Sequence, residues 1–325
     1  LFSLGNFLGS SELDIQKVDL VVGASSAFYG PNAFNGVIAM ETKNPFFNKG
    51  LAASVKVGER NLFETAVRFA DVFKNKSGKP FMAYKLNFSY LRANDWVADN
   101  YDPITNATGN DIFSPALNPG GFNAVNVYGD EYNIFTNGTD FNSFTGMNSF
   151  HRRGYKEEDV VDYDTRNIKS GVAVHIRTSP SKDFDSPEII ASSNFGYGTT
   201  VYQGDNRFSL RGIQFYQHRL EFRKKDKFFI RAFATHEDAG DSYDPYFTAQ
   251  KMIEASSSND AWDRAYRDWW ERNNSFNKLK ALGMSQDNFQ QWQKDNVNVL
   301  EDFHRQAQNF ASSNNRTFSI TDFYQ

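Results

Sequence analysis

Residues 81–90 read Phe-Met-Ala-Tyr-Lys-Leu-Asn-Phe-Ser-Tyr, and this stretch decides the fold class. Successive side chains of a β-strand point to opposite faces, so a strand with one apolar face alternates with period two. The stretch keeps that alternation for about ten residues, the length that a tilted strand needs to cross a bilayer. The apolar face carries Met82, Tyr84, Leu86, Phe88 and Tyr90, and the polar face carries Lys85, Asn87 and Ser89.

The same alternation recurs along the chain. It is clear at 63–73 and at 168–177, where Val172, Val174 and Ile176 oppose Lys169 and Arg177. We predict that the apolar sets face lipid and that Lys85, Asn87, Lys169 and Arg177 face a polar interior. Further strands are expected at 188–197, 213–223 and 227–236, with a weaker one at 51–58.

The links between these strands are sorted by length. Every second link is short and rich in turn residues, whereas the intervening set contains both very long segments. Bacterial outer-membrane barrels have this asymmetry, with short periplasmic turns and long extracellular loops, whereas a soluble sandwich has no reason for it. The short set is 74–80, 178–187 and 224–227, and the other set is 59–62, 94–165, 198–212 and 237–325.

The composition fits this prediction without proving it. Aromatic residues make up 16% of the chain, with 32 Phe, yet the mean hydropathy is −0.60. A transmembrane barrel produces this mixture because lipid-facing and lumen-facing residues alternate, and no run of about 18 apolar residues indicates a membrane helix. A soluble β-rich protein with many aromatics has the same composition. The net charge of −4 argues against a nucleic-acid partner.

The two long segments differ in character. Residues 94–165 are polar and rich in Asn and Gly, which indicates loops and turns. Residues 250–311 have helical spacing of apolar residues, so this loop is expected to be partly helical. Four tryptophans there either stack on a ligand such as a sugar or form the core of the loop itself, and the second interpretation is favoured: Trp262, Trp269, Trp270 and Trp292. The fifth, Trp96, follows a predicted strand end and is expected to be an interface anchor.

Residues 18–43 carry a motif, Val-Asp-Leu-Val-Val-Gly-Ala-Ser-Ser-Ala-Phe-Tyr-Gly-Pro-Asn-Ala-Phe-Asn-Gly-Val-Ile-Ala-Met-Glu-Thr-Lys. It resembles the end of the plug domain of TonB-dependent outer-membrane receptors. The sequence of residues 31–36 is similar to that of receptors from the Bacteroidota, the group that includes SusC-like transporters. Glycines permit tight turns and close backbone approach, and serines satisfy turn backbone groups. The positions that carry the resemblance and form the candidate plug motif are Gly23, Ser25, Ser26, Tyr29, Gly30, Asn35 and Gly36.

The resemblance implies a fold and an activity. We expect an all-β protein: residues 1–48 are the C-terminal part of a plug domain, and residues 49–325 are the N-terminal part of a transmembrane antiparallel β-barrel with extracellular loops at 94–165 and 237–325. The implied function is active import of a glycan, peptide or metal chelate across the bacterial outer membrane. The implied partners are TonB, a SusD-like surface lipoprotein and outer-membrane lipid. The TonB-contacting segment is expected to precede Leu1, and the chain to be an internal piece of a longer protein.

Two features near the motif bear on how the plug is held. Pro45 lacks an N–H and biases Asn44 toward an extended conformation, so a linker is expected there, with the wall starting near Gly50. Family members often carry Arg just before the first Gly of the motif, where this chain has Val22, and Ala24 replaces a frequent Pro. The usual charged contact between plug and barrel is therefore in doubt.

No catalytic constellation is present in the sequence, so an enzyme is not expected. Gly23 to Ala27 lacks the closing Gly of a nucleophile elbow, and the five His residues form no metal-binding pair. No cofactor is expected, although loop-bound calcium is a weak alternative to solvated acids. The candidate acids are Asp162 with Asp164, and Asp238 with Asp241 and Asp244.

Three functions therefore remain open. The first is an energised transporter. The second is a receptor-like barrel that acts as an anchor or assembly platform in a larger envelope complex. The third is a soluble β-rich carbohydrate-binding module.

Overall fold

The computed structural model describes residues 11–23, 36–101, 125–129, 133–135, 149–203, 207–313 and 319. The chain divides into two compact units, which we treat separately. The sheet unit comprises Leu1–Asp95, Tyr163–Tyr202 and Ser209–Ser242, and the helical unit comprises Trp96–Asp162, Gln203–Phe208 and Tyr243–Gln325.

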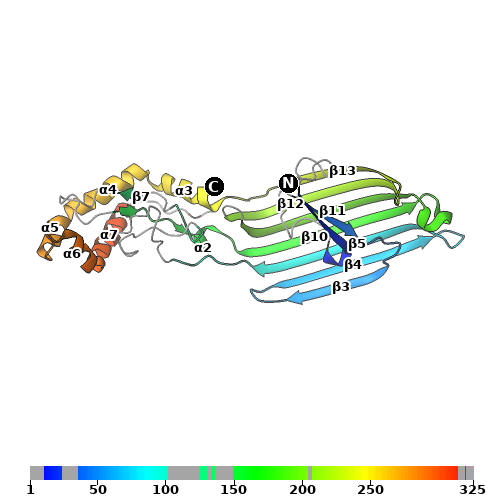
Figure 1. Cartoon of the computed structure of the whole chain (residues 1–325), viewed down its shortest axis with the longest axis horizontal. Coiled ribbons are helices and arrows are strands. Elements are labelled where there is room, and N and C mark those ends of the chain that lie inside the picture. Colours follow the sequence, from blue (N-terminus) through cyan, green and yellow to red (C-terminus); the bar gives the residue numbers. More distant parts are fainter. Residues whose placement is uncertain are drawn as a thin grey trace. The chain divides into compact units, whose positions relative to one another are not determined.

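The sheet unit is built on a seven-stranded antiparallel sheet in the order β13-β12-β11-β10-β5-β4-β3 (Figure 1). Neighbours in the sheet are also neighbours in the order of these strands along the chain, so the strands form a meander. All seven predicted strands are confirmed. Their bounds are β3 Gly50–Val57, β4 Phe63–Lys74, β5 Pro80–Asn94, β10 Asp164–Arg177, β11 Glu188–Gln203, β12 Arg207–Lys224 and β13 Phe228–Asp238.

Several strands are longer than predicted, and the link expected at 198–212 is wrong. β11 continues to Gln203 and β12 already begins at Arg207. The apolar alternation stops after Tyr197 because Gly198, Thr199 and Thr200 follow, so the hydrophobic signal ends before the strand does. Threonine is β-branched and favours strands, which is why the backbone stays extended there.

The meander places the links as their lengths predict. Antiparallel pairing of successive strands puts 75–79, 178–187 and 225–227 at one end of the sheet. The chain leaves β5 and returns at β10 from the opposite end, where β13 also ends. The turn after β4 needs a left-handed residue, and Gly78 supplies it with φ of 75°.

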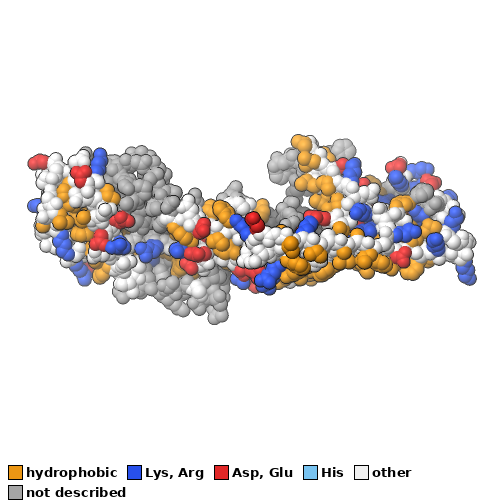
Figure 2. Space-filling model, turned by 90° about the horizontal axis from the view of Figure 1, so that it is seen from below, with side chains coloured by type: hydrophobic (Ala, Val, Ile, Leu, Met, Phe, Trp, Pro, Cys, Tyr) orange, Lys and Arg blue, Asp and Glu red, His pale blue; other side chains and the backbone are white. Residues whose placement is uncertain are grey.

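The two faces of the sheet have opposite chemistry. Leu51, Phe69, Leu86 and Val172 are paired across four strands and therefore share one face, which we call the apolar face. Seen from the β3 edge in Figure 2, hydrophobic side chains gather along one margin of the sheet. The opposite face, which we call the polar face, carries the charged side chains. The predicted separation of Leu86 from Lys85 onto two faces is confirmed.

A two-stranded hairpin lies apart from the seven-stranded sheet. Its strands are β1 Ile15–Val22 and β2 Gly36–Thr42, paired antiparallel with Val18 opposite Met40, and a 3-10 turn, η1 Glu12–Asp14, precedes it. Within the described residues neither strand bonds to the large sheet. Val18 to Val22 are therefore not hydrogen-bonded into the seven-stranded sheet, as predicted. In Figure 1 the dark blue hairpin lies in front of the sheet.

The helical unit joins pieces that are far apart in sequence. Its helices are α2 Glu157–Val160, α3 Pro245–Ser256, α4 Asn259–Arg272, α5 Ser275–Ala281, α6 Phe289–Asp295 and α7 Val297–Ser312. Its short strands are β6 Val127–Tyr128 with β9 Tyr155–Lys156, and β7 Asn133–Phe135 with β8 Ser149–His151. No helix among the described residues is both long and apolar enough to span a membrane.

Aromatic residues form the core of the helical unit. Trp262, Tyr266 and Trp270 follow one another at four-residue spacing on one side of α4, and all three are buried. Phe150 stacks on the Tyr266 ring with centroids 4.1 Å apart, and the Tyr266 hydroxyl lies 2.6 Å from Nδ1 of His304 on α7. Burial raises the pKa of Tyr266 well above its ordinary value, so the phenol stays protonated.

The helix junction between α3 and α4 is held by one arginine. Arg152 is almost fully buried, and its guanidinium donates to the carbonyls of Ser257 at 2.7 Å and Ile253 at 3.1 Å. These groups belong to the C-terminal end of α3, where a cation is favourable because the carbonyls of the last turn carry a partial negative charge. At the start of α4 the Ser258 side chain accepts a hydrogen bond from the Ala261 N–H.

Replacing Trp270 with Ala should destabilise the helical unit by about 3–5 kcal/mol, because a fully buried indole leaves a cavity. Native-state hydrogen exchange of the α4 and α7 amides measures the loss. The control is Phe247→Ala on α3, whose side chain is exposed and whose removal should change stability by less than about 0.5 kcal/mol. Unchanged protection in the Trp270 variant would contradict this core.

Candidate functional site on the polar face

Charged side chains are buried on the polar face of the sheet. Arg68, Lys85, His175, Arg177 and Glu188 are each less than 10% exposed. Isolated buried charges are strongly unfavourable, so such groups need partners. Their partners come from two sources, the hairpin with its linker and the neighbouring strands.

The central contact is a carboxylate between two cations. Asp14 is 1% exposed, and its Oδ1 lies 2.8 Å from Nε of Arg68 on β4 while its Oδ2 lies 2.6 Å from Nζ of Lys85 on β5. Each carboxylate oxygen therefore accepts one charge-assisted hydrogen bond. We call this group of three the latch, because it joins the start of the hairpin to the sheet.

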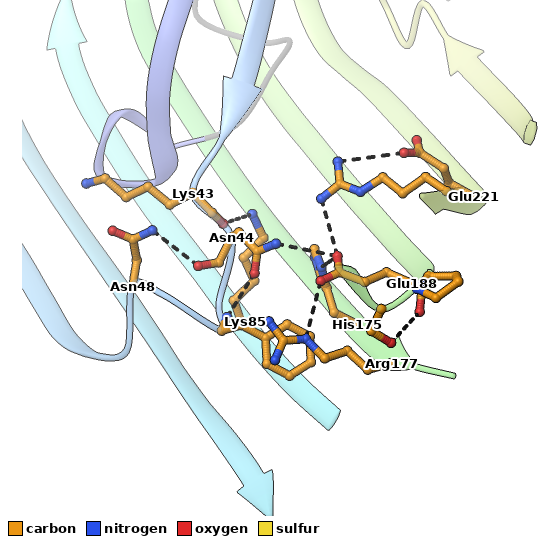
Figure 3. A network of polar contacts seen from close by, with 12 residues as sticks. Lys43, Asn44, Asn48, Lys85, His175, Arg177, Glu188 and Glu221 are labelled. Atoms are coloured by element: carbon orange, nitrogen blue, oxygen red, sulfur yellow. Dashed lines mark hydrogen bonds and ion pairs between the residues drawn. The ribbon is translucent and has the colours of Figure 1, made fainter. Parts of the chain in front are cut away.

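Backbone carbonyls of the linker complete the latch. Lys85 Nζ also donates to the Lys43 carbonyl at 2.9 Å, and Arg68 Nη1 donates to the Asn48 carbonyl at 3.0 Å. On the hairpin side, the Lys43 N–H donates to the Asp14 carbonyl at 2.7 Å. The latch thus fixes the start of β1 and the end of β2, which lie side by side at the open end of the hairpin. Figure 3 shows the contact of Lys85 with the Lys43 carbonyl, and the Asn48 side chain directed at Asn44.

The linker after β2 makes a tight turn. Asn44 Oδ1 accepts from the Phe46 N–H at 2.9 Å, and the Asn44 carbonyl accepts from the Asn48 N–H at 3.0 Å. An Asn side chain that bonds its backbone two residues on is a common turn device, and Pro45 fits within it. The predicted linker at Asn44-Pro45 is confirmed, and β3 begins at Gly50 as expected.

The turn is anchored by an aromatic ring. Phe46 is 6% exposed, and the Arg177 guanidinium carbon lies 4.0 Å from its ring centroid. His175 meets the same ring edge-on, with centroids 6.4 Å apart. A buried cation over a phenyl face contributes about 0.5–2 kcal/mol. Phe46 therefore joins the linker to β10, whereas its neighbour Phe47 is largely exposed.

Glu188 connects the linker with the strands beyond. Its Oε2 lies 3.5 Å from Asn44 Nδ2, 3.7 Å from His175 Nδ1 and 3.4 Å from Arg223 Nη2. Its Oε1 lies 3.7 Å from Arg177 Nε. Figure 3 shows how Asn44, His175 and Arg177 converge on this one carboxylate.

A charged contact between hairpin and sheet exists, but it does not involve Val22, the position at which family members often carry Arg. Val22 is largely exposed and makes no such contact among the described residues. Asp14 supplies the charge instead, eight residues earlier and with the opposite sign. The sequence signal was available in Arg68 and Lys85, two cations on predicted strands, but nothing in the sequence identified Asp14 as their partner.

The candidate plug motif is only partly described. Gly23 follows β1 with φ of 95°, a left-handed conformation that favours glycine, and Gly36 opens β2 opposite Val22. Ser25, Ser26, Tyr29, Gly30 and Asn35 lie outside the described residues.

The tryptophans follow the favoured interpretation. Trp262, Trp270 and Trp292 belong to the core of the helical unit and are each less than 7% exposed, so in this conformation they offer no ring face to a ligand. Trp269 packs against that core and is partly buried. Trp96 is 57% exposed, and its role as an interface anchor stays a prediction.

The candidate calcium acids have local structural roles. Asp244 caps α3 by accepting from the Tyr246 N–H at 2.9 Å, and Asp238 accepts from the Gly240 N–H at 2.9 Å. Asp164 pairs with Arg166. Within the described residues no group of three His, Cys, Asp or Glu side chains is placed to hold a metal ion. No protein-family model matches this chain.

Replacing Asp14 with Asn should weaken the contact between hairpin and sheet by about 3–5 kcal/mol, because two buried cations lose their only carboxylate in the latch. Faster hydrogen exchange of the β1 and β2 amides reports the change. Adding Lys85→Met to Asp14→Asn should recover part of the loss, since one uncompensated cation is removed.

The matched control is Asp19→Asn, which breaks an exposed pair with Lys17 on the same hairpin. Exposed ion pairs contribute about 0–1 kcal/mol, so hairpin exchange should barely change. Equal effects of the two substitutions would show that the latch does not hold the hairpin.

Proposed function

We propose that the seven-stranded sheet is part of the wall of a transmembrane β-barrel in the bacterial outer membrane, that the hairpin belongs to an internal plug, and that the protein imports a nutrient ligand with energy delivered through TonB. The observation that carries this proposal is the reversed chemistry of the sheet. The side chains of its apolar face are exposed, whereas the polar face carries the buried charges of Arg68, Lys85, His175, Arg177 and Glu188.

The apolar face is too large and too exposed for a sheet in water. A soluble sheet would bury this face against a core and leave the charges outside. Lipid is the solvent that accepts the observed arrangement, because lipid-facing strand positions must be apolar. The members more than 35% exposed include Leu51, Val55, Val57, Phe63, Val67, Phe69, Phe73, Leu86, Phe88, Val172, Ile176, Ile189, Leu220, Phe222 and Ile230.

The height of this face suits a bilayer. Met82 and Tyr90 bound its apolar run on β5 and are eight residues apart, which is roughly 27 Å along the strand. A strand tilt of about 40° lowers the height to roughly 20 Å, close to the apolar band of outer-membrane barrels. Arg92 on β5 and Arg166 on β10 follow opposite each other at one end, and short polar links close the other.

The sheet has two open edges. β3 and β13 each pair on one side only among the described residues, which do not close into a barrel. Ile230, on the apolar face of β13, is 70% exposed. Long apolar edge strands lead to aggregation in water, and closure with further strands removes them. We therefore propose that further strands pair with both edges.

The hairpin contact supports a plug that moves. It consists of ion pairs and hydrogen bonds on a polar face, not of an apolar core. Such groups can be solvated again when they separate in a water-filled lumen, whereas a separated apolar interface cannot. This favours a transporter over a static anchor. The imported class remains glycan, peptide or metal chelate, with TonB and a SusD-like lipoprotein as the proposed partners.

The two alternatives make different demands. An anchor or assembly platform needs the same barrel but no contact with TonB. A soluble carbohydrate-binding module would use exposed aromatics for sugar stacking, yet three of the four candidate tryptophans, Trp262, Trp270 and Trp292, are buried. Migration on a gel that changes on heating would separate both barrel proteins from the soluble module.

Cysteine labelling tests the membrane assignment directly, because the chain contains no native Cys. In lipid vesicles, the thiol of Leu86→Cys should react with a lipid-soluble maleimide and be quenched by brominated lipid. The control is Ser89→Cys on the polar face of the same strand, which should prefer a water-soluble maleimide. Preferential aqueous labelling at position 86 would remove the basis for the proposed function.

Binding to the periplasmic domain of TonB tests the energy source. The full-length protein should retain that domain on a column, and deletion of its TonB-contacting segment should abolish retention while heat-modifiable migration persists. A heat-modifiable protein that never binds TonB would favour the anchor over the transporter.

A further inference from the structure

Three arginines surround one buried glutamate on the polar face, at strands β12 and β13. Arg219 and Arg223 lie two residues before and after Glu221 on the same face of β12, and Arg231 on β13 is its cross-strand partner. The Glu221 carboxylate lies 2.6 Å from Arg231 Nε, 3.8 Å from Arg223 Nη1 and 3.9 Å from Arg219 Nη1. We call these three arginines with Glu221 the arginine cluster.

The cluster carries more positive than negative charge. Arg223 also approaches Glu188, which is shared with Arg177. Four guanidinium groups therefore face two carboxylates, which leaves an excess of two positive charges. Like charges at this separation repel one another, and an additional anion would offset that repulsion. Arg219 Nε is buried and has no hydrogen-bond partner among the described residues.

The excess charge is accessible from the polar face. The side chains of Arg219, Arg223 and Arg231 are 35%, 36% and 43% exposed, whereas that of Glu221 is 2% exposed. A solute can therefore reach the cations without displacing the glutamate. Guanidinium groups suit carboxylate and phosphate because their planar N–H donors match two oxygens at once.

Two phenyl rings flank the cations. Phe229 is the cross-strand partner of Arg223, and Phe233 is that of Arg219, so both rings lie on the polar face beside the cluster. They are 67% and 72% exposed. Exposed phenyl rings next to exposed guanidinium groups fit a ligand that is both anionic and partly apolar.

We propose that the arginine cluster binds an organic anion with an apolar or aromatic body, held by Arg219, Arg223 and Arg231 and packed on Phe229 and Phe233. This inference rests on the proposed function, because a barrel makes the polar face the wall of a water-filled lumen. The inference narrows the imported ligand to organic anions with an apolar or aromatic body. Glu221 organises the three arginines and limits the affinity for anions.

Phthalate and succinate are suitable probes, because both are dicarboxylates and only phthalate carries an aromatic ring. Calorimetric titration of the purified protein in detergent should show phthalate binding that weakens as salt is added. Succinate should bind more weakly. Equal binding of the two probes would overturn the role of the phenyl rings, and absence of phthalate binding would overturn the site.

Substitutions assign the binding to the cluster. Arg219→Gln and Arg231→Gln should each weaken phthalate binding by about fivefold or more. Glu221→Gln should strengthen it by about fivefold, which a purely structural role of Glu221 does not predict. The control is Lys56→Gln, which removes a cation of the same face on β3 that is paired with Glu12 and Glu64. A loss in the Lys56 variant equal to that in the arginine variants would overturn the assignment.

Heat-modifiable migration of every variant separates the two proposals. A protein that migrates as a barrel but ignores phthalate refutes the anion site and leaves the barrel standing. A protein that lacks this migration refutes the proposed function. The phthalate titration then tests only whether the arginine cluster binds an anion.

Discussion

The buried carboxylate of Asp14 between Arg68 and Lys85 is the interaction on which the sheet unit depends. Two cations on adjacent strands of one face would repel each other and resist burial without it. Once the carboxylate is in place, the Lys43 carbonyl accepts a further hydrogen bond from Lys85 and the Asn48 carbonyl accepts one from Arg68. The hairpin, the linker and the start of β3 are thereby positioned by one charged centre. Among the described residues, the apolar face of the sheet stays largely exposed.

Strand periodicity was the part of the fold that the sequence could reveal. Residues such as Met82 to Tyr90 alternate strictly, because each strand separates an apolar face from a polar one, and this also located the turns. The signal failed from Gly198 to Thr200, where the side chains on both faces are small or polar and no large apolar residue marks the alternation. Pro45 located the linker for a local reason, the missing N–H, which needs no tertiary information.

The candidate site was less predictable because it is made by long-range partners. Asp14 meets Lys85 across 71 positions of sequence, and Glu188 meets Asn44 across 144. A local pattern cannot announce such contacts. The helical spacing of Trp262, Tyr266 and Trp270 did predict an aromatic face on α4. It could not predict that Phe150, from a segment that looked like polar loop, stacks on that face.

A polar latch is a poor device for maximising stability and a suitable one for a contact that must separate. Burying three charges costs desolvation free energy that their attraction only partly offsets, so apolar residues of similar volume would often hold as well or better. The ion pairs of the latch give the hairpin a defined position on the sheet, and the charged groups can be hydrated again when they separate. The linker keeps the hairpin attached to β3, so in the proposed transport cycle the latch would re-form at a high effective concentration without a bimolecular encounter. Strong apolar packing would remove this reversibility, because its separation exposes surface that water does not solvate favourably.

The small apolar contribution at Phe46 lies in the linker, not between hairpin strands and sheet. The hairpin strands themselves are therefore held chiefly by interactions that water can replace.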